Sequence, residues 1–492
     1  MKKTIPFQLP LRREINQLSG SLDFREQRAL FQKIDSLLAQ SGVDADLVNS
    51  VLRKRHGRIT DKLVNRIHHA FRCVILMRLT GLDYREFSCR LADSNLYQWF
   101  TWCGDYGLCQ PSSKSSLQRY VGMFDQLKLS EAIHDVMLQA ASENPENRLG
   151  KLNEALCFED IFADCTCVKA NIHFPTDWVL LIDSVRTLMK SILLIREQGL
   201  RHRMPEPESF MNRANQLAIA MSAARRGRNA RRMRKKILRL LKKLNHHVGR
   251  HAERYRDLLD REWEKTGWSR KQADQVIRRM NQVIEQLPAA IQQTHERIIG
   301  ERKVDNDEKI LSLYETDVHV IVRGKAGAEV EFGNKLYLAE QQDGLIVDWM
   351  LYKEDVPSDT KLVAESVERI KDCVGTYPKG YVTDRGFASK RNKAYLESRG
   401  IRDGMCAKDP EELRDRMKED WYKAAQKRRG STEGRIGLFK HMFLRGVMRE
   451  KGFEHREQAL VWSILAHNLW VLARMSLSDE AERKKLAAQK AA

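Results

Sequence analysis

The chain has 492 residues and carries 86 Lys and Arg against 66 Asp and Glu, a formal net charge of +20. This length allows two to four domains of ordinary size and excludes a single small domain. The excess of cations points to a polyanionic partner, most commonly nucleic acid, although a ribosome-associated or merely well-solvated basic protein is an alternative on charge alone.

The nine cysteines are scattered. Their closest groupings, Cys165 with Cys167 and Cys103 with Cys109, lack the paired spacing of a zinc site. The N-terminus has no apolar run of signal-peptide length, and no stretch approaches the roughly 20 apolar residues of a membrane span. We therefore expect a cytoplasmic protein that has no membrane partner.

Residues 1–150 are expected to form an all-helical domain for DNA binding or dimerisation. Apolar residues recur at three- and four-residue steps from Leu63 to Met77, and a turn follows at Gly81. Ser112 and Ser113 are suitable N-cap residues for a further helix. Such short helices can form a helix-turn-helix that binds a DNA groove. A small helical bundle that only packs on the rest is an equal alternative.

Residues 151–178 are expected to contain the first strand, with Asp164 near its end, because 156–168 is apolar, β-branched and aromatic. Residues 179–310 read as an inserted antiparallel helical hairpin of coiled-coil type, with a kink at Pro288. Within it the segment RRGRNARRMRKKILRLLKK carries cations on every face except an apolar stripe. Such a high density of positive charge predicts contacts with DNA phosphates. The alternative is a basic helix that does not contact DNA. The expected DNA-binding residues there are Arg231, Arg232, Arg234, Lys235, Arg239 and Lys242.

Strand and helix patterns alternate over 311–475. FGNKLYLAEQQDGLIVDWMLYKED predicts a β-hairpin joined at Gln-Asp-Gly, GYVTD predicts a strand, and a long helical region contains Glu433. Residues 476–492 are expected to form a charged C-terminal tail. The fold class is therefore a helix-rich α+β protein, whose mixed sheet is flanked by helices and split in sequence by the helical insertion.

Three acids stand where this sheet would bring them together: Asp164, Asp384 and Glu433. Clustered carboxylates are costly unless a cation neutralises them, and two Mg²⁺ ions bridged by such acids support attack at a phosphodiester. An acid at a strand end is ordinarily a turn former or a helix cap, so each one alone is weak evidence.

Other acids compete for these positions. Asp160 is the rival first ligand, four residues before Asp164. The alternatives to Glu433 are Glu411, Glu412 and Glu419. Glu411 and Glu412 follow Pro410 directly, so we interpret them as acids in the first turn of a helix, where a negative charge interacts favourably with the helix dipole.

Four segments carry a resemblance to a known family. ADCTCVKANIHFPTD, from Ala163 to Asp177, resembles the Asp-(Ser/Ala)-Thr-x-Val-x-Ala-Asn-Ile-x-(Tyr/Phe)-Pro-Thr-Asp segment of bacterial insertion-sequence transposases of the DD(E) kind. RGKAGAEVEFGNKLYL with DGLIVDW, and VTDRGFASKRN, are similar to the hairpin and second-aspartate blocks of that group. RRGSTEGRIGLFK resembles its glutamate helix and fits Arg-x3-Glu-x6-Lys through Arg429, Glu433 and Lys440.

The resemblance implies an RNase H-like fold and a DNA transposase that cuts element ends and joins them to new DNA as a homodimer or larger assembly. It implies Asp164, Asp384 and Glu433 as ligands of two Mg²⁺ or Mn²⁺ ions, with Arg429 and Lys440 on phosphates. Gln426 departs from the family, which has tyrosine there. His173 and Asp177 match the motif but are equally read as structural. A transposase-derived DNA-binding protein without catalysis, and a nuclease that cuts without joining, are the alternatives.

Overall fold

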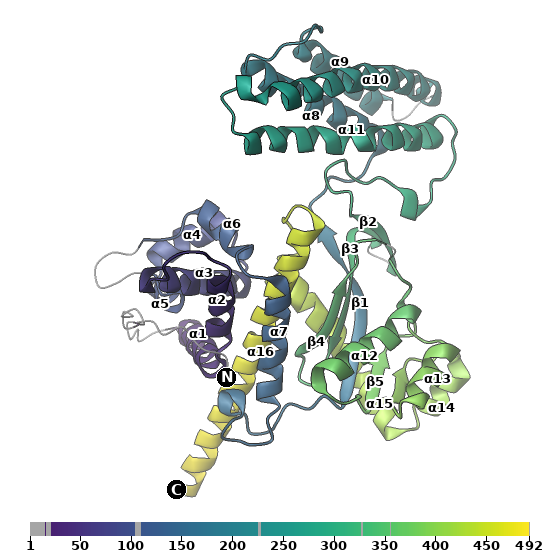
Figure 1. Ribbon diagram of the computed structural model, residues 1–492. Helices are drawn as coiled ribbons and strands as arrows, with labels where there is room; N and C mark the ends of the chain where they lie inside the picture. The colour runs from purple at the N-terminus through teal and green to yellow at the C-terminus, as the bar shows by residue number, and fades with distance from the viewer. Residues whose placement is uncertain are drawn as a thin grey trace. The chain divides into compact units, whose positions relative to one another are not determined.

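The computed structural model describes residue 15 and residues 21–103, 110–224, 228–325, 328–354 and 356–491. The chain forms two compact units (Figure 1). Met1–Val168 and Lys335–Ala492 make the first, called the sheet unit here, and Lys169–Asn334 make the second, called the insertion unit. The boundaries between the units fall inside two strands, β1 and β3, so the chain passes from one unit to the other within β-strands.

The N-terminal region of the described chain is helical, as predicted. Polar side chains begin several of its helices: those of Thr60, Asp83 and Ser113 accept backbone N–H groups from α3, α4 and α6. Gly81 ends α3 in the left-handed conformation, which confirms the predicted turn. The helices are α1 (Leu22–Ser41), α2 (Val43–Arg53), α3 (Asp61–Thr80), α4 (Tyr84–Asp93), α5 (Asn95–Thr101), α6 (Lys114–Val121) and α7 (Gln126–Ala140).

These helices share one hydrophobic core with the sheet and with the C-terminal helix. Trp462 is fully buried and packs its ring against Phe71 and Phe124. Arg72, also buried, pairs with Asp35 at 2.5 Å and with Asp44 at 3.2 Å, which compensates the burial of its charge. The N-terminal helices therefore pack as part of the sheet unit.

In the described ranges, seven strands form a mixed sheet flanked by helices, which confirms the coarse fold class. The order is β2-β3-β1-β5-β6, with β4 beside β3 and β7 beside β1. β1, β5 and β6 are parallel, whereas β2, β3 and β4 are antiparallel, so the predicted hairpin is confirmed as β3–β4. The strands are β1 (Asp160–Ala170), β2 (His319–Lys325), β3 (Ala328–Glu340), β4 (Ile346–Leu351), β5 (Gly380–Thr383), β6 (Arg402–Met405) and β7 (Val447–Met448).

Alternate residues of β1 and β5 face different helices. Tyr381 belongs to the main core, where its hydroxyl meets that of Tyr337, which donates to Ser366 of α12 at 2.6 Å. Phe162 and Val382 instead pack against Ala425 of α15. The helices after β4 are α12 (Leu362–Val374), α13 (Lys390–Ser398), α14 (Pro410–Arg416), α15 (Asp420–Leu438), the π-helical turn η5 (Phe439–Phe443) and α16 (Phe453–Ala491), and the 3₁₀ turns of the chain are η1 (Leu149–Lys151), η2 (Trp263–Lys265), η3 (Asn306–Glu308) and η4 (Asp359–Lys361).

Three boundaries differ from the sequence predictions. Asp164 lies inside β1, because the strand continues to Ala170 after its pairing with β5 stops at Ala163. The late helical region is interrupted by β7, and the expected tail at 476–492 continues α16 as a helix to Ala491. Sequence periodicity detects neither a short strand nor the extension of a buried helix into a polar one.

Among its described residues the insertion unit holds four α-helices: α10 and α11 correspond to the two predicted arms and pack together, whereas α8 and α9 were not predicted as separate helices. The long helices α10 and α11 share one core with α8 and α9 (Figure 1). α8 is apolar over much of its circumference, which obscured its boundaries in sequence, and α11 continues through Pro288. The helices are α8 (Asp177–Glu197), α9 (Pro207–Ala223), α10 (Ala230–Glu262) and α11 (Arg270–Ile298).

In the described part of the chain, α16 is the one helix long and apolar enough to cross a membrane, over Phe453–Gln489. It is more apolar than the sequence reading allowed. Within the structure 72% of its most apolar window is buried. That burial is what the core helix of a folded unit shows.

Gly380 opens β5 where a side chain has no room. A Cβ atom there would lie 2.2 Å from Asp160 Oδ1 and 2.5 Å from the Trp421 ring. We expect Gly380→Ala to lower the free energy of unfolding by about 1–3 kcal/mol, as overpacking does. Urea denaturation followed by circular dichroism measures the loss.

Gly437→Ala is the matched control, because a Cβ atom at that helical position meets no atom within 4 Å. Alanine favours a helix over glycine, so this variant should be as stable as the parent chain or more so. Equal losses for the two variants would contradict the steric argument.

Candidate active site

The pairing of β1 with β5 brings two predicted aspartates side by side. Ala163 of β1 is the register partner of Thr383 of β5, so Asp164 and Asp384 follow at neighbouring positions. Adjacent strands lie about 4.8 Å apart. Side chains alternate along a strand, so Asp164 shares a face with Phe162, the face that α15 covers.

The charge state of Asp164 reflects these neighbours. Its pKa is raised to about 6, first by burial, then by the negative charge of Asp384 and, more weakly, by that of Glu433. The backbone N–H of Cys165, which donates to Asp164 Oδ1 at 2.7 Å, and the charge of Arg429 act in the opposite direction. Both of the other predicted acids therefore act electrostatically on Asp164.

α15 carries Glu433 across this face of the sheet. The guanidinium carbon of Arg428 lies 4.4 Å from the centre of the Phe162 ring, and Ala425 packs on the same ring cluster. One turn later the Glu433 carboxylate lies 3.9 Å from Arg429 Nη1. The Glu433 side chain is 57% exposed, so it is accessible to a ligand from solvent.

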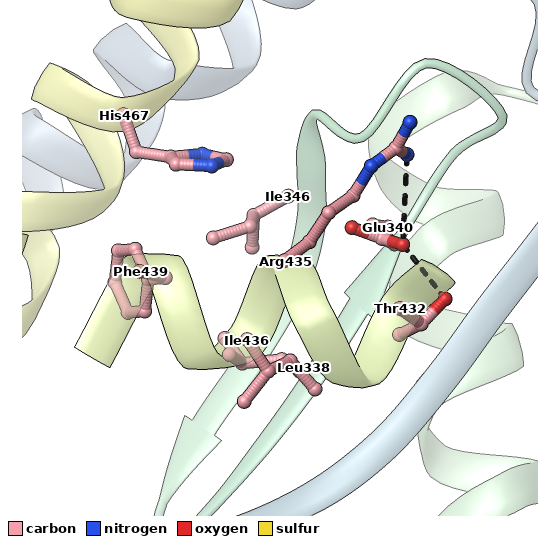
Figure 2. A pocket seen from close by; sticks show the side chains of 8 residues that line it. All are labelled: Leu338, Glu340, Ile346, Thr432, Arg435, Ile436, Phe439 and His467. Atoms are coloured by element: carbon pink, nitrogen blue, oxygen red, sulfur yellow. Dashed lines mark hydrogen bonds and ion pairs between the residues drawn. The ribbon is translucent and has the colours of Figure 1, made fainter. Parts of the chain in front are cut away.

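A buried carboxylate, Glu340 at the end of β3, holds α15 against the sheet. It accepts from Thr432 Oγ1 at 2.8 Å and from Arg428 Nη1 at 3.0 Å, and Arg435 Nη1 lies at 3.7 Å. Figure 2 shows Thr432 and Arg435 pointing from α15 towards this carboxylate, beside a small pocket lined by His467. Thr432 precedes Glu433 directly, so these bonds fix the position of the glutamate along the sheet. The sequence reading missed Glu340 because it has no motif.

Gln426 stands where the resembling family has tyrosine. Its Nε2 donates to the backbone oxygen of Gly404 in β6 at 2.7 Å, and its Oε1 accepts from Arg429 Nε at 3.0 Å. The glutamine therefore ties the helix to β6 and orients the guanidinium of Arg429. This positioning role is a second one that the sequence did not indicate.

Lys440 lies beyond the end of α15 rather than on it. It belongs to the π-helical turn η5, so it does not continue the regular α-helix that carries Arg429 and Glu433. Lys440 Nζ nevertheless donates to Thr166 Oγ1 of β1 at 3.1 Å. Thr166 is two residues beyond Asp164, which places the ammonium group beside the aspartates.

A fourth carboxylate lies near Asp384. A Cβ atom on Gly386 would meet Asp384 Oδ1 at 3.0 Å and Asp359 Oδ2 at 3.1 Å, and the Gly386 N–H donates to Asp384 Oδ1 at 2.8 Å. Asp359 pairs with Lys335 at 2.6 Å. Burial raises the pKa of the Cys165 thiol, and the negative charge of Asp359 raises it further. Because Lys335 neutralises it, Asp359 reads as a flanking charge rather than a fourth ligand.

The rival acids lie elsewhere. Asp160 starts β1, four residues before Asp164, where Trp421 Nε1 donates to it at 3.2 Å and Arg402 lies 3.4 Å away. Glu411 and Glu412 occupy the first turn of α14, as expected for dipole-answering acids, and Glu419 is the N-cap residue of α15.

The chemical type of the candidate ligand atoms is suited to a hard cation. Asp164, Asp384 and Glu433 offer only carboxylate oxygens, which Mg²⁺ and Mn²⁺ prefer, and the raised pKa of Asp164 is the cost that a cation would relieve. In the ranges that the structure describes, no three His, Cys, Asp or Glu side chains are arranged to hold a metal ion. Glu433 instead pairs with Arg429 and would have to turn towards the aspartates.

The matched residues His173 and Asp177 belong to the insertion unit. Asp177 begins α8 and is bound by Gln293 Nε2 at 2.9 Å and Arg297 Nη1 at 2.8 Å of α11. This is the structural role that the sequence left open for it. His173 is exposed.

The predicted DNA-binding cations of α10 divide into two groups. Arg232, Arg234 and Arg239 are exposed. Arg231 and Lys235 pair with Glu301, and Lys242 lies 3.1 Å from His295 Nδ1. A straight exposed stripe runs opposite the buried face at helical spacing, and its members are Arg232, Lys236, Arg239, Lys243 and Arg250. Arg225, Arg226 and Gly227, which open the predicted basic segment, lie outside the described residues.

No protein-family model, curated protein or solved structure that was compared with the chain matches it.

Glu340→Gln tests the anchor of α15. The change keeps the shape but leaves Arg428, only 12% exposed, without its counter-charge. We expect the free energy of unfolding to fall by about 3 kcal/mol, the scale for a broken buried pair. Glu131→Gln, which removes an exposed carboxylate from Lys128, should cost much less in the same urea denaturation. Equal losses would show that Glu340 is no special anchor.

Asp164→Asn tests the electrostatic cost of the site. Because the pKa of Asp164 is raised in the folded chain, its stabilising effect is complete below the unfolded pKa, near 4, and is lost as the pH rises through about 6. In EDTA the variant should therefore exceed the parent in stability by on the order of 2 kcal/mol at pH 8, with a smaller gain as the pH falls towards 4. Asp160→Asn, whose carboxylate has Trp421 and Arg402 as partners, should give no such gain. A pH-independent difference for Asp164→Asn would refute the assignment.

Proposed function

We propose that this chain is a DD(E) DNA transposase with an RNase H-like catalytic fold, in which Asp164, Asp384 and Glu433 are the metal ligands. The β1–β5 register carries the proposal, because it sets two aspartates at neighbouring positions under the helix that bears the glutamate. The resemblance of four segments to insertion-sequence transposases and the net charge of +20 support it independently.

The three carboxylates would hold two divalent cations, which supply activation of the attacking hydroxyl and stabilisation of the leaving oxygen at a phosphodiester. Gln426 orients Arg429, whose planar guanidinium is suited to bind a phosphate of the DNA strand that is cut. Lys440 sits on Thr166 beside the aspartates and offers a second positive charge to the DNA backbone. Glu340 holds α15 in position on the sheet, so that Arg429 and Lys440 can contact the same DNA strand.

The partners of this reaction are two element ends and a target duplex. Holding two ends for coordinated joining requires at least two active sites, so the working assembly is a homodimer or larger on DNA. The exposed stripe of α10, with Arg232 and Arg239, is proposed as a sequence-independent contact to phosphates.

Strand transfer is the decisive assay. The substrate is a DNA fragment that carries the gene with its flanking sequence, incubated with target plasmid and Mg²⁺ or Mn²⁺. Glu433→Gln should abolish both cleavage and joining while DNA binding stays nearly unchanged, since one exposed charge is removed and the shape is kept.

The matched control is Glu419→Gln, which alters the N-cap residue of the same helix and should retain both reactions. Cleavage without joining by the parent chain would make it a nuclease, and binding without either reaction would make it a DNA-binding protein. A Glu433→Gln variant that still cuts would remove Glu433 from the site.

A further inference from the structure

A broad groove of about 940 Å³ lies within the sheet unit, and none of the three candidate metal ligands lines it. One wall comes from α4 and α6 of the N-terminal region. The other comes from the segment 445–458, which follows η5 and includes β7 and the start of α16. Residues from the two ends of the sequence therefore line one groove.

Cations dominate both walls. The first wall contributes Arg85, Lys114 and Arg119, all exposed, and the second contributes Arg449 and Lys451, also exposed. Among the described residues, Arg85, Lys114 and Lys451 have no ion-pair partner. Unneutralised like charges that face one another across a groove repel unless an anion lies between them.

The two acids of the groove are already engaged in the fold. Asp83 caps α4 by accepting the N–H groups of Arg85 and Glu86, and Arg449 Nη1 lies 3.7 Å from it. Glu450 binds the buried Arg78 at 3.0 Å. Neither carboxylate is available to neutralise Lys114 or Lys451.

Arg445 adds a half-buried cation to the groove lining. Burial and the nearby charge of Arg78 lower its pKa to about 10, and its Nε makes no hydrogen bond within the described chain. An incoming anion would relieve both costs. The polar lining argues against an apolar ligand, which prefers pockets walled by hydrophobic side chains.

We propose that this groove binds the phosphate backbone of double-stranded DNA, as a contact surface separate from the carboxylate site. The inference rests on the proposed function for its choice of duplex DNA over other polyanions. Because β7 pairs with β1, the second wall is hydrogen-bonded to the strand that carries Asp164. DNA held in the groove is therefore anchored to the same sheet as the candidate catalytic acids.

The test is the salt dependence of binding by the full-length chain to a labelled duplex of the gene's flanking sequence, measured by fluorescence anisotropy in EDTA. Lys114→Ala with Lys451→Ala removes one exposed cation from each wall. The slope of log Kd against log salt should fall by up to about 0.9 for each lost phosphate contact, with several-fold weaker binding near 0.1 M salt.

The control pair is Lys484→Ala with Lys485→Ala, which removes the same two charges from exposed positions of α16. They lie roughly 45 Å along the helix from His455, at a rise of 1.5 Å per residue. This pair should leave the slope unchanged. Equal effects of the two pairs would overturn the groove assignment.

Two further outcomes are distinct. If an acidic polypeptide competes as well as duplex DNA and loses affinity in the Lys114→Ala, Lys451→Ala variant, the groove belongs to a protein partner and the proposal fails. If the parent chain does not bind duplex DNA at all, the proposed transposase function fails with it. Near-parental circular dichroism of both variant pairs shows that they are folded.

Discussion

Parallel pairing of β1 with β5 is the constraint on which the candidate site depends. It sets Asp164 against Asp384 and at the same time presents Phe162 and Val382 to α15. The helix can cover that face only because small and aromatic side chains, Ala425 and Trp421, meet it. One pairing register thus determines both the acids and the helix that brings a third one.

The negative charges of Glu340 and Asp164 are balanced differently. Glu340 is buried with two guanidinium groups near it, so its charge is compensated within the fold. Asp164 faces two other acids, and its raised pKa records the imbalance. Buried cations neutralise Glu340 and Asp359, whereas Asp164 lies among other carboxylates. Negative charge is therefore concentrated at Asp164.

The sequence was sufficient for features with local signals. Capping side chains and periodic apolar residues predicted α3 and α6, and alternation predicted the β3–β4 hairpin and β5. It was insufficient where distant contacts decide. Glu340 has meaning only through Arg428, 88 residues later, and Gln426 only through the backbone of β6. The four-helix insertion was read as two helices because α8 buries more than one face.

The π-helical turn η5 has a consequence for sequence change in this region. A π turn holds one more residue than an α turn, so it shifts the angular phase of everything that follows it. Losing a single residue between Phe439 and Phe443 would restore regular α-helix and rotate the following segment by about 100° about the helix axis. Arg445, which follows the turn, would rotate away from the groove. Length in this turn is therefore constrained more tightly than residue identity.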